Sequence, residues 1–212
     1  LNPKIKVIGV EPEGAACMKA SLERGEVMTL PKVSTIADGT AVKTPGHNIF
    51  PYIQKNVDEI LTVSDDELIV AFLDMVENHK MVVENSGLLT VAALKHLNVR
   101  GKKIVSVLSG GNMDVITMAS VVQRGLIQRD RIFTVSVLLP DRPGELVRVA
   151  SVIAEQQGNV IKLEHNQFVS TNRNAAVELR ITLEAFGTEH KMSIIQALKD
   201  HGYDPVQKTA SL

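Results

Sequence analysis

Apolar positions in the first part of the chain alternate between short continuous runs and runs with helical spacing. The continuous runs predict strands at 5–10, 57–63, 81–85 and 102–108. The helical runs predict helices at 13–25, 64–80, 86–101 and 112–126. Ser64 and Glu67 have capping-box spacing, and Gly25 is a helix stop. Continuously apolar strands that alternate with helices are typical of a parallel α/β sheet.

The pattern changes after a polar stretch at 128–131. It then predicts strands at 132–140, 159–168 and 175–186, helices at 141–158 and 188–203, and a last strand within 204–208. Pro143 is expected near the first turn of the 141–158 helix, and Gly158 just past its end. The order βαββαβ is the ferredoxin-like split βαβ arrangement. The sequence therefore predicts two domains, 1–127 and 128–212.

Composition and charge exclude several classes of protein. The 212 residues are 44% hydrophobic and 22% charged, with a formal net charge of −1. This charge balance gives no basic excess for nucleic acid or an anionic membrane surface. The apolar runs are far shorter than the roughly 20 residues that span a bilayer. The only cysteine, Cys17, permits no internal disulfide and favours a reducing compartment, so we expect a cytoplasmic location.

The predicted strand at 102–108 runs directly into Ser109, Gly110 and Gly111. Two positions without side chains allow a ligand to come close to the backbone, and the Ser109 hydroxyl can point at it. An alternative is that Ser109 or Asn112 caps the next helix while the glycines form an ordinary turn. The residues alone leave both interpretations open.

Four motifs in register resemble the threonine/serine dehydratase family of fold type II pyridoxal-phosphate enzymes. They are VIGVEPEG (7–14), TIADGTAV (35–42), VVENSGLLTVAAL (82–94) and VSVLSGGNMD (105–114). The stretch LPDRPGELVRVASVIAEQQGNV (139–160) resembles an ACT domain, a regulatory module that commonly binds amino acids. The whole chain thus resembles the C-terminal portion of a dehydratase: part of the catalytic domain of fold type II, followed by a single ACT domain.

The resemblance implies roles for five residues around pyridoxal 5'-phosphate. Ser109 would meet the pyridine nitrogen, with Gly110 and Gly111 beneath the ring. A neutral hydroxyl at that nitrogen suits β-elimination over transamination. Gly39 would lie against the ring, and Glu84 would face the cofactor side of the cleft. The alternatives are an Asp38–Gly39 turn and a carboxylate stabilised by a helix N-terminus.

A monovalent or divalent cation is also implied by the resemblance, held by the Glu11 carboxylate and the Ala15 carbonyl. Hard cations take oxygen ligands. The third family position, six residues after Glu11, is Cys17 here, and a thiol is a poor ligand for such cations. The alternatives are a solvated Glu11 at the end of a strand and a small buried Cys17 on a helix.

The ACT resemblance implies an amino-acid effector, isoleucine or valine. The candidate contacts are Pro143, Gly144, Glu145, Leu146, Gly158, Asn159 and His165. Backbone N–H groups at the start of the helix could hold a carboxylate. The alternative is that these residues are ordinary helix ends. Pairing of ACT domains implies a homo-oligomer, a dimer or a tetramer.

The implied activity is dehydration and deamination of L-threonine, or L-serine, to 2-oxobutanoate, or pyruvate, and ammonia, a step of isoleucine biosynthesis. The resemblance places the Schiff-base lysine and the phosphate loop upstream, so no catalytic residue is assigned here. We expect the 212-residue chain alone to be inactive. The alternatives are a non-catalytic, amino-acid-sensing fragment and a serine or threonine racemase of the same fold.

Overall fold

The computed structural model describes residues 2, 4–98, 100–167 and 177–210. The chain forms two compact units, Leu1–Gly125 (unit 1) and Leu126–Leu212 (unit 2). The sequence places its boundary between 127 and 128, at the end of helix α5 (Val115–Gln128). None of the helices in the described part of the chain has the length and apolar character needed to cross a membrane.

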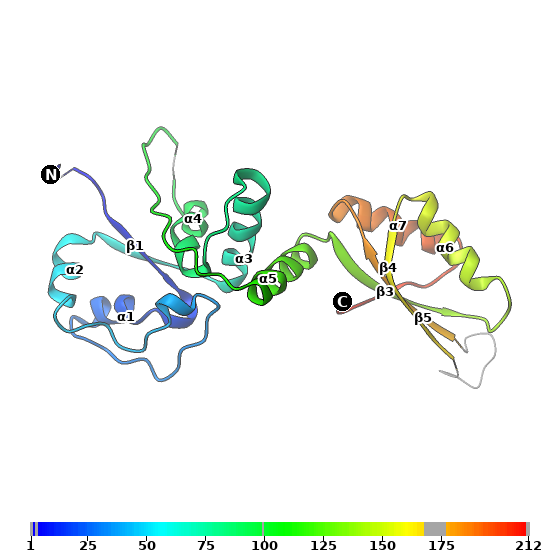
Figure 1. The fold of residues 1–212 in the computed structure, drawn as a ribbon, viewed down its shortest axis with the longest axis horizontal. Coiled ribbons are helices and arrows are strands. Elements are labelled where there is room, and N and C mark those ends of the chain that lie inside the picture. The colour runs from blue at the N-terminus through cyan, green and yellow to red at the C-terminus, as the bar shows by residue number, and fades with distance from the viewer. Residues whose placement is uncertain (1, 3, 99, 168–176, 211–212) are drawn as a thin grey trace. The chain divides into compact units, whose positions relative to one another are not determined.

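Unit 1 contains two parallel strands, β1 (Ile8–Pro12) and β2 (Glu59–Val63), with Ile8 opposite Glu59 and Pro12 opposite Val63. Its helices before α5 are α1 (Cys17–Arg24), α2 (Phe50–Asn56), α3 (Asp65–Asp74) and α4 (Leu89–Ala92) (Figure 1). Short helical turns are η1 (Glu13–Ala15), η2 (Asp38–Thr40), η3 (Met75–His79), η4 (Asn85–Leu88) and η5 (Ala93–His96).

Local signals explain where the helices of unit 1 begin and end. The Glu67 N–H donates to the Ser64 hydroxyl at 3.3 Å, and the Ser64 N–H donates to the Glu67 carboxylate at 2.7 Å. This capping box confirms the predicted start of α3. Helix α1 ends at Gly25, which takes a φ of 83° that glycine adopts without steric cost. The predicted stop at Gly25 is also confirmed.

The core of unit 1 forms around one face of α3. Leu68, Ile69 and Phe72 are fully buried there. They pack with residues from four other parts of the unit: Ala37, Val63, Val83, Leu88, Leu89, Ala92, Ala93 and Val121. This core holds the 84–88 turn and the start of α5 in place, and both belong to the candidate site.

Three predictions for unit 1 were wrong. The segments 81–85 and 102–108 are not strands, and the predicted helix at 86–101 is reduced to η4, α4 and η5. A strand exists only where a neighbouring strand pairs with its backbone. In the described part of the chain, neither segment has such a neighbour.

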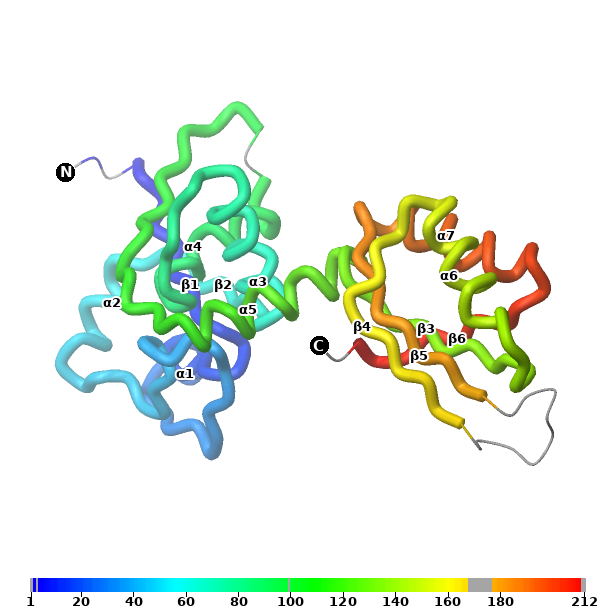
Figure 2. Tube along the Cα trace, turned by 45° about the vertical axis from the view of Figure 1, so that its right-hand side comes forward, coloured from blue at the N-terminus to red at the C-terminus, as the bar shows by residue number. Residues whose placement is uncertain are grey.

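Unit 2 has the predicted βαββαβ order. Its elements are β3 (Ile132–Leu139), α6 (Glu145–Glu155), β4 (Asn159–Asn166), β5 (Val177–Glu184), α7 (Thr188–Asp200) and β6 (Val206–Lys208). The strands form one antiparallel sheet in the order β4-β5-β3-β6. Figure 2 shows α6 and α7 together on one face of this sheet. Residues 168 and 175–176, predicted at strand ends, lie outside the described residues.

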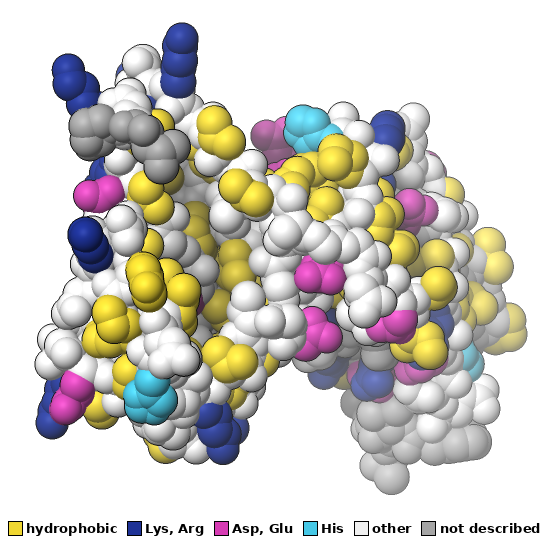
Figure 3. All heavy atoms as spheres, turned by 60° about the vertical axis from the view of Figure 1, so that its left-hand side comes forward, with side chains coloured by type: hydrophobic (Ala, Val, Ile, Leu, Met, Phe, Trp, Pro, Cys, Tyr) yellow, Lys and Arg dark blue, Asp and Glu magenta, His cyan; other side chains and the backbone are white. Residues whose placement is uncertain are grey.

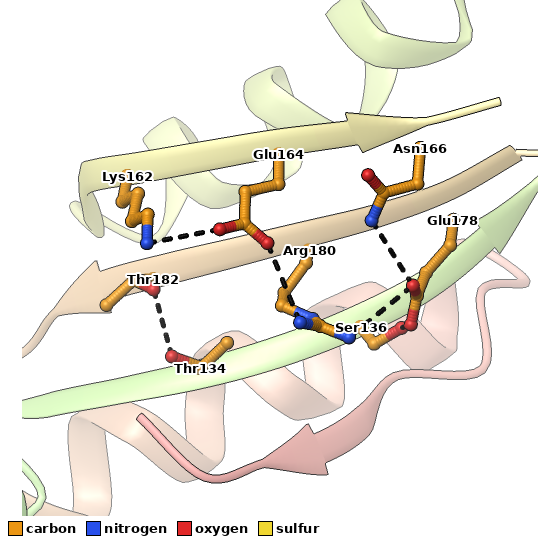
Figure 4. Close-up of polar contacts among 8 residues, drawn as sticks. All are labelled: Thr134, Ser136, Lys162, Glu164, Asn166, Glu178, Arg180 and Thr182. Carbon is orange, nitrogen blue, oxygen red and sulfur yellow. Dashed lines mark hydrogen bonds and ion pairs between the residues drawn. The ribbon is translucent and has the colours of Figure 1, made fainter. Parts of the chain in front are cut away.

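Alternation along the strands separates the two faces of this sheet. The predicted inward face of β5 is confirmed, because Val177, Leu179, Ile181 and Leu183 are all buried in the core with α6 and α7. The other face carries a network of polar side chains (Figure 4). The Thr134 and Thr182 hydroxyls lie 2.9 Å apart, and Ser136 donates to Glu178 at 2.6 Å. The bond from Ser136 lowers the pKa of the Glu178 carboxyl.

Helix α6 is shorter than predicted at both ends. The N-cap is Gly144, at a φ of 93°, so Pro143 precedes the helix instead of lying in its first turn. At the other end, Gln157 takes the left-handed φ of 61°. Gly158 follows, and a side chain there would crowd Ile153. The predicted stop is therefore shared between Gln157 and Gly158.

Candidate functional site

Three of the predicted cofactor residues meet in unit 1. A Cβ atom at Gly39 would lie 2.8 Å from the Ser86 hydroxyl and 3.7 Å from the Glu84 carboxylate. A Cβ atom at Gly110 would overlap that same carboxylate. Gly110 also has a φ of 78°, which L side chains rarely adopt. Gly39, Glu84 and Gly110, which are far apart in the sequence, therefore form one cluster around the Glu84 side chain.

Backbone contacts hold the 84–87 turn against the 109–112 loop. The Glu84 N–H donates to the Gly110 carbonyl at 3.4 Å, and the Asn112 N–H donates to Glu84 Oε2 at 3.3 Å. A Cβ atom at Gly87 would overlap the Ser109 carbonyl group. The two loops can approach this closely only because Gly87 and Gly110 lack side chains.

Ser109 and Gly111 are exposed, and a Cβ atom at Gly111 would meet nothing within 4 Å. The alternative role for Ser109 or Asn112 as cap of α5 is wrong. The Asp114 carboxylate accepts hydrogen bonds from the Ile116 and Thr117 N–H groups, both at 2.9 Å. Hydrogen bonds from the Thr117 side chain and N–H lower the pKa of this carboxyl. Because Asp114 caps the helix, the Ser109 hydroxyl remains available to a ligand.

A cavity of about 360 Å³ adjoins this cluster. Of the five predicted cofactor residues only Glu84 lines it, together with Asp38, whereas Gly39, Ser109, Gly110 and Gly111 are not among its lining residues. The lining also includes Thr35, Ile36, Ile69, Asn85, Asn112, Met113, Asp114, Ile116, Thr117, Ser120, Val121 and Arg124. The cavity is therefore partly polar and belongs to unit 1 alone.

Asn85 and Ser86 are site residues that the sequence prediction missed. Asn85 is 4% exposed; its Nδ2 donates to the Ile36 carbonyl at 3.1 Å, and its Oδ1 has no partner among the described residues. The Ser86 hydroxyl is likewise buried and unpartnered there, so Ser86 is not a helix N-cap. Three polar residues between two apolar runs, Glu84 to Ser86, were the signal that could have revealed them.

Glu11 caps helix α1. The Met18 N–H donates to its Oε1 at 2.9 Å, and the Lys19 N–H donates to its Oε2 at 2.8 Å. Glu11 is therefore not a freely solvated side chain, and a cation would compete with these bonds. Ala15 is buried in η1, four residues along the chain. The described residues contain no group of three His, Cys, Asp or Glu side chains placed to hold a metal, and the cation stays a prediction.

Cys17 is a buried free thiol at the start of α1. Burial, with a smaller contribution from the Glu11 charge, raises the pKa of this thiol. A raised pKa disfavours the thiolate, which is the nucleophilic and metal-binding form. The geometry agrees with a packing role for this side chain.

Unit 2 has its own cavity, of about 290 Å³, at the start of α6. Five of the seven candidate effector residues line it, namely Pro143, Gly144, Glu145, Leu146 and His165. The lining is completed by Leu139, Pro140, Asp141, Arg142 and Val177. It thus combines apolar side chains with both signs of charge, as a site for a small zwitterion would.

Gly158 and Asn159 lie away from this cavity, although the sequence grouped them with it. Gly158 packs against Ile153 and Ile194, and the Asn159 side-chain amide donates to Glu184 at 3.2 Å. Gly158 therefore packs at the end of α6, and Asn159 links the paired strands β4 and β5. The structure therefore does not bring them together with the other five residues.

Comparison with known proteins identifies the class to which this geometry belongs. Residues 1–110 match the model of the pyridoxal-phosphate dependent enzyme family, and the chain belongs to that family. It is 39% identical to the L-threonine ammonia-lyase of Geobacter sulfurreducens over 204 residues, which are 95% of this chain and 51% of that protein. The chain therefore spans about half the length of this relative.

Two solved structures extend the comparison. Threonine deaminase isoform 2 from Solanum lycopersicum, in its processed form, is 34% identical, with a TM-score of 0.55 over 57% of this chain and 36% of that one. Maize serine racemase is 32% identical, with a TM-score of 0.51 over 58% of this chain and 41% of that one. The similar fold is thus shared by proteins named for different reactions.

The cofactor of this family is pyridoxal phosphate, and the cluster in unit 1 fits such a group. Gly39 and Gly110 lack side chains, so the Ser86 and Glu84 side chains can lie close against these two backbone positions. Ser86 offers a buried hydroxyl without a partner among the described residues. Buried polar atoms normally have partners, so an unpartnered one in a glycine-lined site indicates a missing group.

Proposed function

We propose that this chain is the part of a threonine ammonia-lyase that provides one wall of the active site and its regulatory domain. The observation that carries the proposal is the cluster of Gly39, Glu84 and Gly110. These residues were chosen from the sequence and its family resemblance, and they come together in space. The 39% identity to an L-threonine ammonia-lyase supports the same reaction.

Each residue of the cluster has a defined task in this proposal. The Ser109 hydroxyl binds the pyridine nitrogen, Gly39 lies against the ring, and Gly110 leaves room for the Glu84 carboxylate. Glu84, held by the Asn112 N–H, fixes the turn that lines the ring and faces the cleft. Pyridoxal phosphate, when bound, supplies the electron sink that makes the α-proton of an amino acid acidic.

The net reaction converts L-threonine into 2-oxobutanoate and ammonia, and L-serine into pyruvate and ammonia. The α-proton and the β-hydroxyl leave as water, and one water molecule is taken up when ammonia departs. No oxidant or reductant is consumed. The lysine that removes the α-proton and the loop that binds the phosphate belong, in this proposal, to the part of the relatives' chain outside the matched half.

We also propose that unit 2 is an ACT domain that binds an amino-acid effector such as isoleucine or valine. The βαββαβ order and the cavity lined by Pro143, Gly144, Glu145, Leu146 and His165 support this. Control requires that the effector bind two states with different affinity. Copies of unit 2 would pair in a homo-oligomer, and the partly exposed Ile161 and Leu163 on edge strand β4 offer a surface for that contact.

A racemase is the second candidate, because maize serine racemase has a similar fold over 58% of this chain. The two reactions share the abstraction of the α-proton and differ in the next step. A lyase releases ammonia and a 2-oxo acid, whereas a racemase returns the proton to the opposite face. Product analysis therefore separates them.

The test is an assay of two preparations with pyridoxal phosphate and L-threonine. We expect the 212-residue chain alone to release no ammonia. When it is co-expressed with the part of the Geobacter relative outside the match, ammonia and 2-oxobutanoate should form. Formation of a D-amino acid without ammonia would replace the lyase by a racemase. Activity of the 212-residue chain alone would contradict the upstream position of the lysine.

Gly39→Ala provides the matched test of the site. A methyl group 2.8 Å from the Ser86 hydroxyl should disturb the cluster and weaken cofactor binding in the co-expressed preparation, measured by the visible absorbance of bound pyridoxal phosphate. Gly46→Ala is the control, because a Cβ atom there would meet only Ile49, at an ordinary 3.4 Å. Equal cofactor binding by both variants would remove Gly39 from the site.

A further inference from the structure

The segment 35–37 is neither helix nor strand, and side chains hold it in place. The Thr35 hydroxyl donates to Asp65 Oδ1 at 2.6 Å, and the Ile36 N–H donates to Asp65 Oδ2 at 3.2 Å. The Ala37 N–H donates in turn to the Thr35 hydroxyl oxygen at 3.1 Å. One carboxylate therefore organises three consecutive residues, although it lies 30 positions further along the chain.

A further hydrogen bond reaches the same segment from the 84–87 turn. Asn85 Nδ2 donates to the Ile36 carbonyl at 3.1 Å. Asn85 is 4% exposed and Ala37 is fully buried, so this contact lies in the interior of unit 1. Figure 3 shows hydrophobic side chains gathered on this unit, several of them inside a hollow. Hydrogen bonds in such apolar surroundings are stronger than in water, because the local dielectric constant is low.

Asp65 is itself fixed by the core. It is the first residue of α3 and lies between the two residues of the capping box, Ser64 and Glu67. The same helix forms the centre of the core of unit 1. Both oxygens of the Asp65 carboxylate accept hydrogen bonds from the segment 35–37. Asp65 thus ties the position of this segment to the core.

The position of Gly39 follows from that of the segment. Only Asp38 separates them, and the Gly39 N–H donates to Asp38 Oδ1 at 2.9 Å. The Thr40 N–H and hydroxyl both donate to the Ala37 carbonyl, at 3.1 and 3.0 Å. These bonds close a tight turn around Gly39, so a shift of the segment would move Gly39 with it.

We propose that Asp65 and Thr35 are positioning residues for the cofactor and act through Gly39. Together with Asn85, they fix the distance between Gly39 and the 84–87 turn. This inference rests on the proposed function, in which Gly39 lies against the ring of pyridoxal phosphate. It adds a residue on α3, outside the motifs of the family resemblance, to the set that shapes the site.

Two simpler roles for Asp65 are less well supported. Direct contact with a ligand is not favoured, because Thr35 and Ile36 line the adjoining cavity and Asp65 does not. An acidic residue in the first turn of a helix can also stabilise the helix by its charge alone. Asp66 lies in the same turn and is exposed, so it shares that charge effect. The hydrogen bonds to 35–37 distinguish Asp65 from Asp66.

The first experiment tests these bonds in the 212-residue chain. Thr35→Val keeps the shape of the side chain and removes the hydroxyl, which is both the donor to Asp65 and the acceptor for the Ala37 N–H. We expect hydrogen exchange of the Ala37 amide to become about tenfold faster. Thr35→Ser keeps a hydroxyl and should leave the rate close to that of the unchanged chain.

The second experiment measures the cofactor in the preparation co-expressed with the rest of the Geobacter relative. Thr35→Val and Asp65→Ala should each weaken binding of pyridoxal phosphate about tenfold and shift its visible absorbance maximum. Thr35→Ser and Asp66→Ala should change neither quantity. A purely structural role would lower the midpoint of thermal unfolding and leave the absorbance maximum of the bound cofactor in place.

The positioning role is overturned if Thr35→Val and Thr35→Ser bind the cofactor equally and with the same absorbance maximum. Equal effects of Asp65→Ala and Asp66→Ala would also overturn it, in favour of the charge effect. Equal amide exchange in the two Thr35 variants would show that the segment is held in another way, whatever reaction the protein performs. Absence of bound pyridoxal phosphate from the unchanged co-expressed preparation would instead remove the proposed function, and the positioning role with it.

Discussion

Unit 1 and unit 2 both contain apolar, strand-like sequences, but these sequences differ in how far they pair into sheets and become buried. In unit 2, β3, β4, β5 and β6 join one sheet, and the inward side chains of β5 are fully covered by α6 and α7. In unit 1, only β1 and β2 pair among the described residues, while 102–108 keeps its valines exposed. The contrast teaches that an apolar run specifies a strand only together with its neighbours. A unit that contains all its neighbours can be predicted from its own sequence.

The largest expected effect comes from a core truncation in unit 2. Ile181→Ala removes a side chain that is 1% exposed and should lower the free energy of unfolding of unit 2 by ~2–5 kcal/mol. Val105→Ala removes a side chain of unit 1 that water already surrounds, and should change stability by less than about 0.5 kcal/mol. Urea unfolding followed by hydrogen exchange measures each unit separately. Similar costs in the two units would contradict the contrast between them.

Gly110→Ala tests the tightest contact in unit 1. An alanine at the left-handed φ of this position should lower the free energy of unfolding by roughly 1–2 kcal/mol, and its methyl group also overlaps the Glu84 carboxylate. Gly101→Ala is matched in backbone, with a φ of 70°, but meets no atom within 4 Å. Thermal unfolding should show a larger loss for Gly110→Ala, and only this variant should change the environment of Glu84. Equal losses would mean that backbone strain alone accounts for the effect.

The smallest expected effect is a pH dependence in unit 2. Lys191 lies 2.7 Å from Asp130, and its hydrogen bond, with one from Thr188, lowers the pKa of the Asp130 carboxyl below its ordinary value of 3.8. A lowered pKa in the folded state stabilises unit 2 at neutral pH. This contribution is lost as the pH falls below 3.8, through the folded pKa.

Asp130→Asn should therefore cost about 1 kcal/mol at neutral pH, and this difference should shrink as the solution is acidified. Urea midpoints at a series of pH values measure it. Asp204→Asn, which changes an exposed carboxylate of the same unit, is the control. A difference that stays constant down to strongly acidic pH would show that the ion pair with Lys191 does not contribute.

Features set by short-range chemistry could be predicted from the sequence. The Ser64–Glu67 capping box, the stop at Gly25 and the inward face of β5 depend on residues that are close along the chain, and all three are confirmed. The element order of unit 2 follows from its alternating pattern for the same reason.

Features that depend on distant partners could not be predicted in this way. The cap of α5 is Asp114 and not Ser109 or Asn112, because the 109–112 loop is held by Glu84 and Gly87 from another segment. Glu11 lies in the preceding strand and caps α1, and no local sequence motif predicts this cap. The family resemblance grouped Gly39, Glu84 and Gly110, but the contacts that join them, including those of Ser86, come from the fold.

Position 110 is constrained twice, once by its backbone angle and once by the carboxylate that occupies the space of a side chain. No single replacement relieves both constraints. An evolving sequence that abandons this glycine would have to shorten residue 84 and rebuild the turn at the same time. Positions 84 and 110 should accordingly change together or not at all across the descendants of this protein.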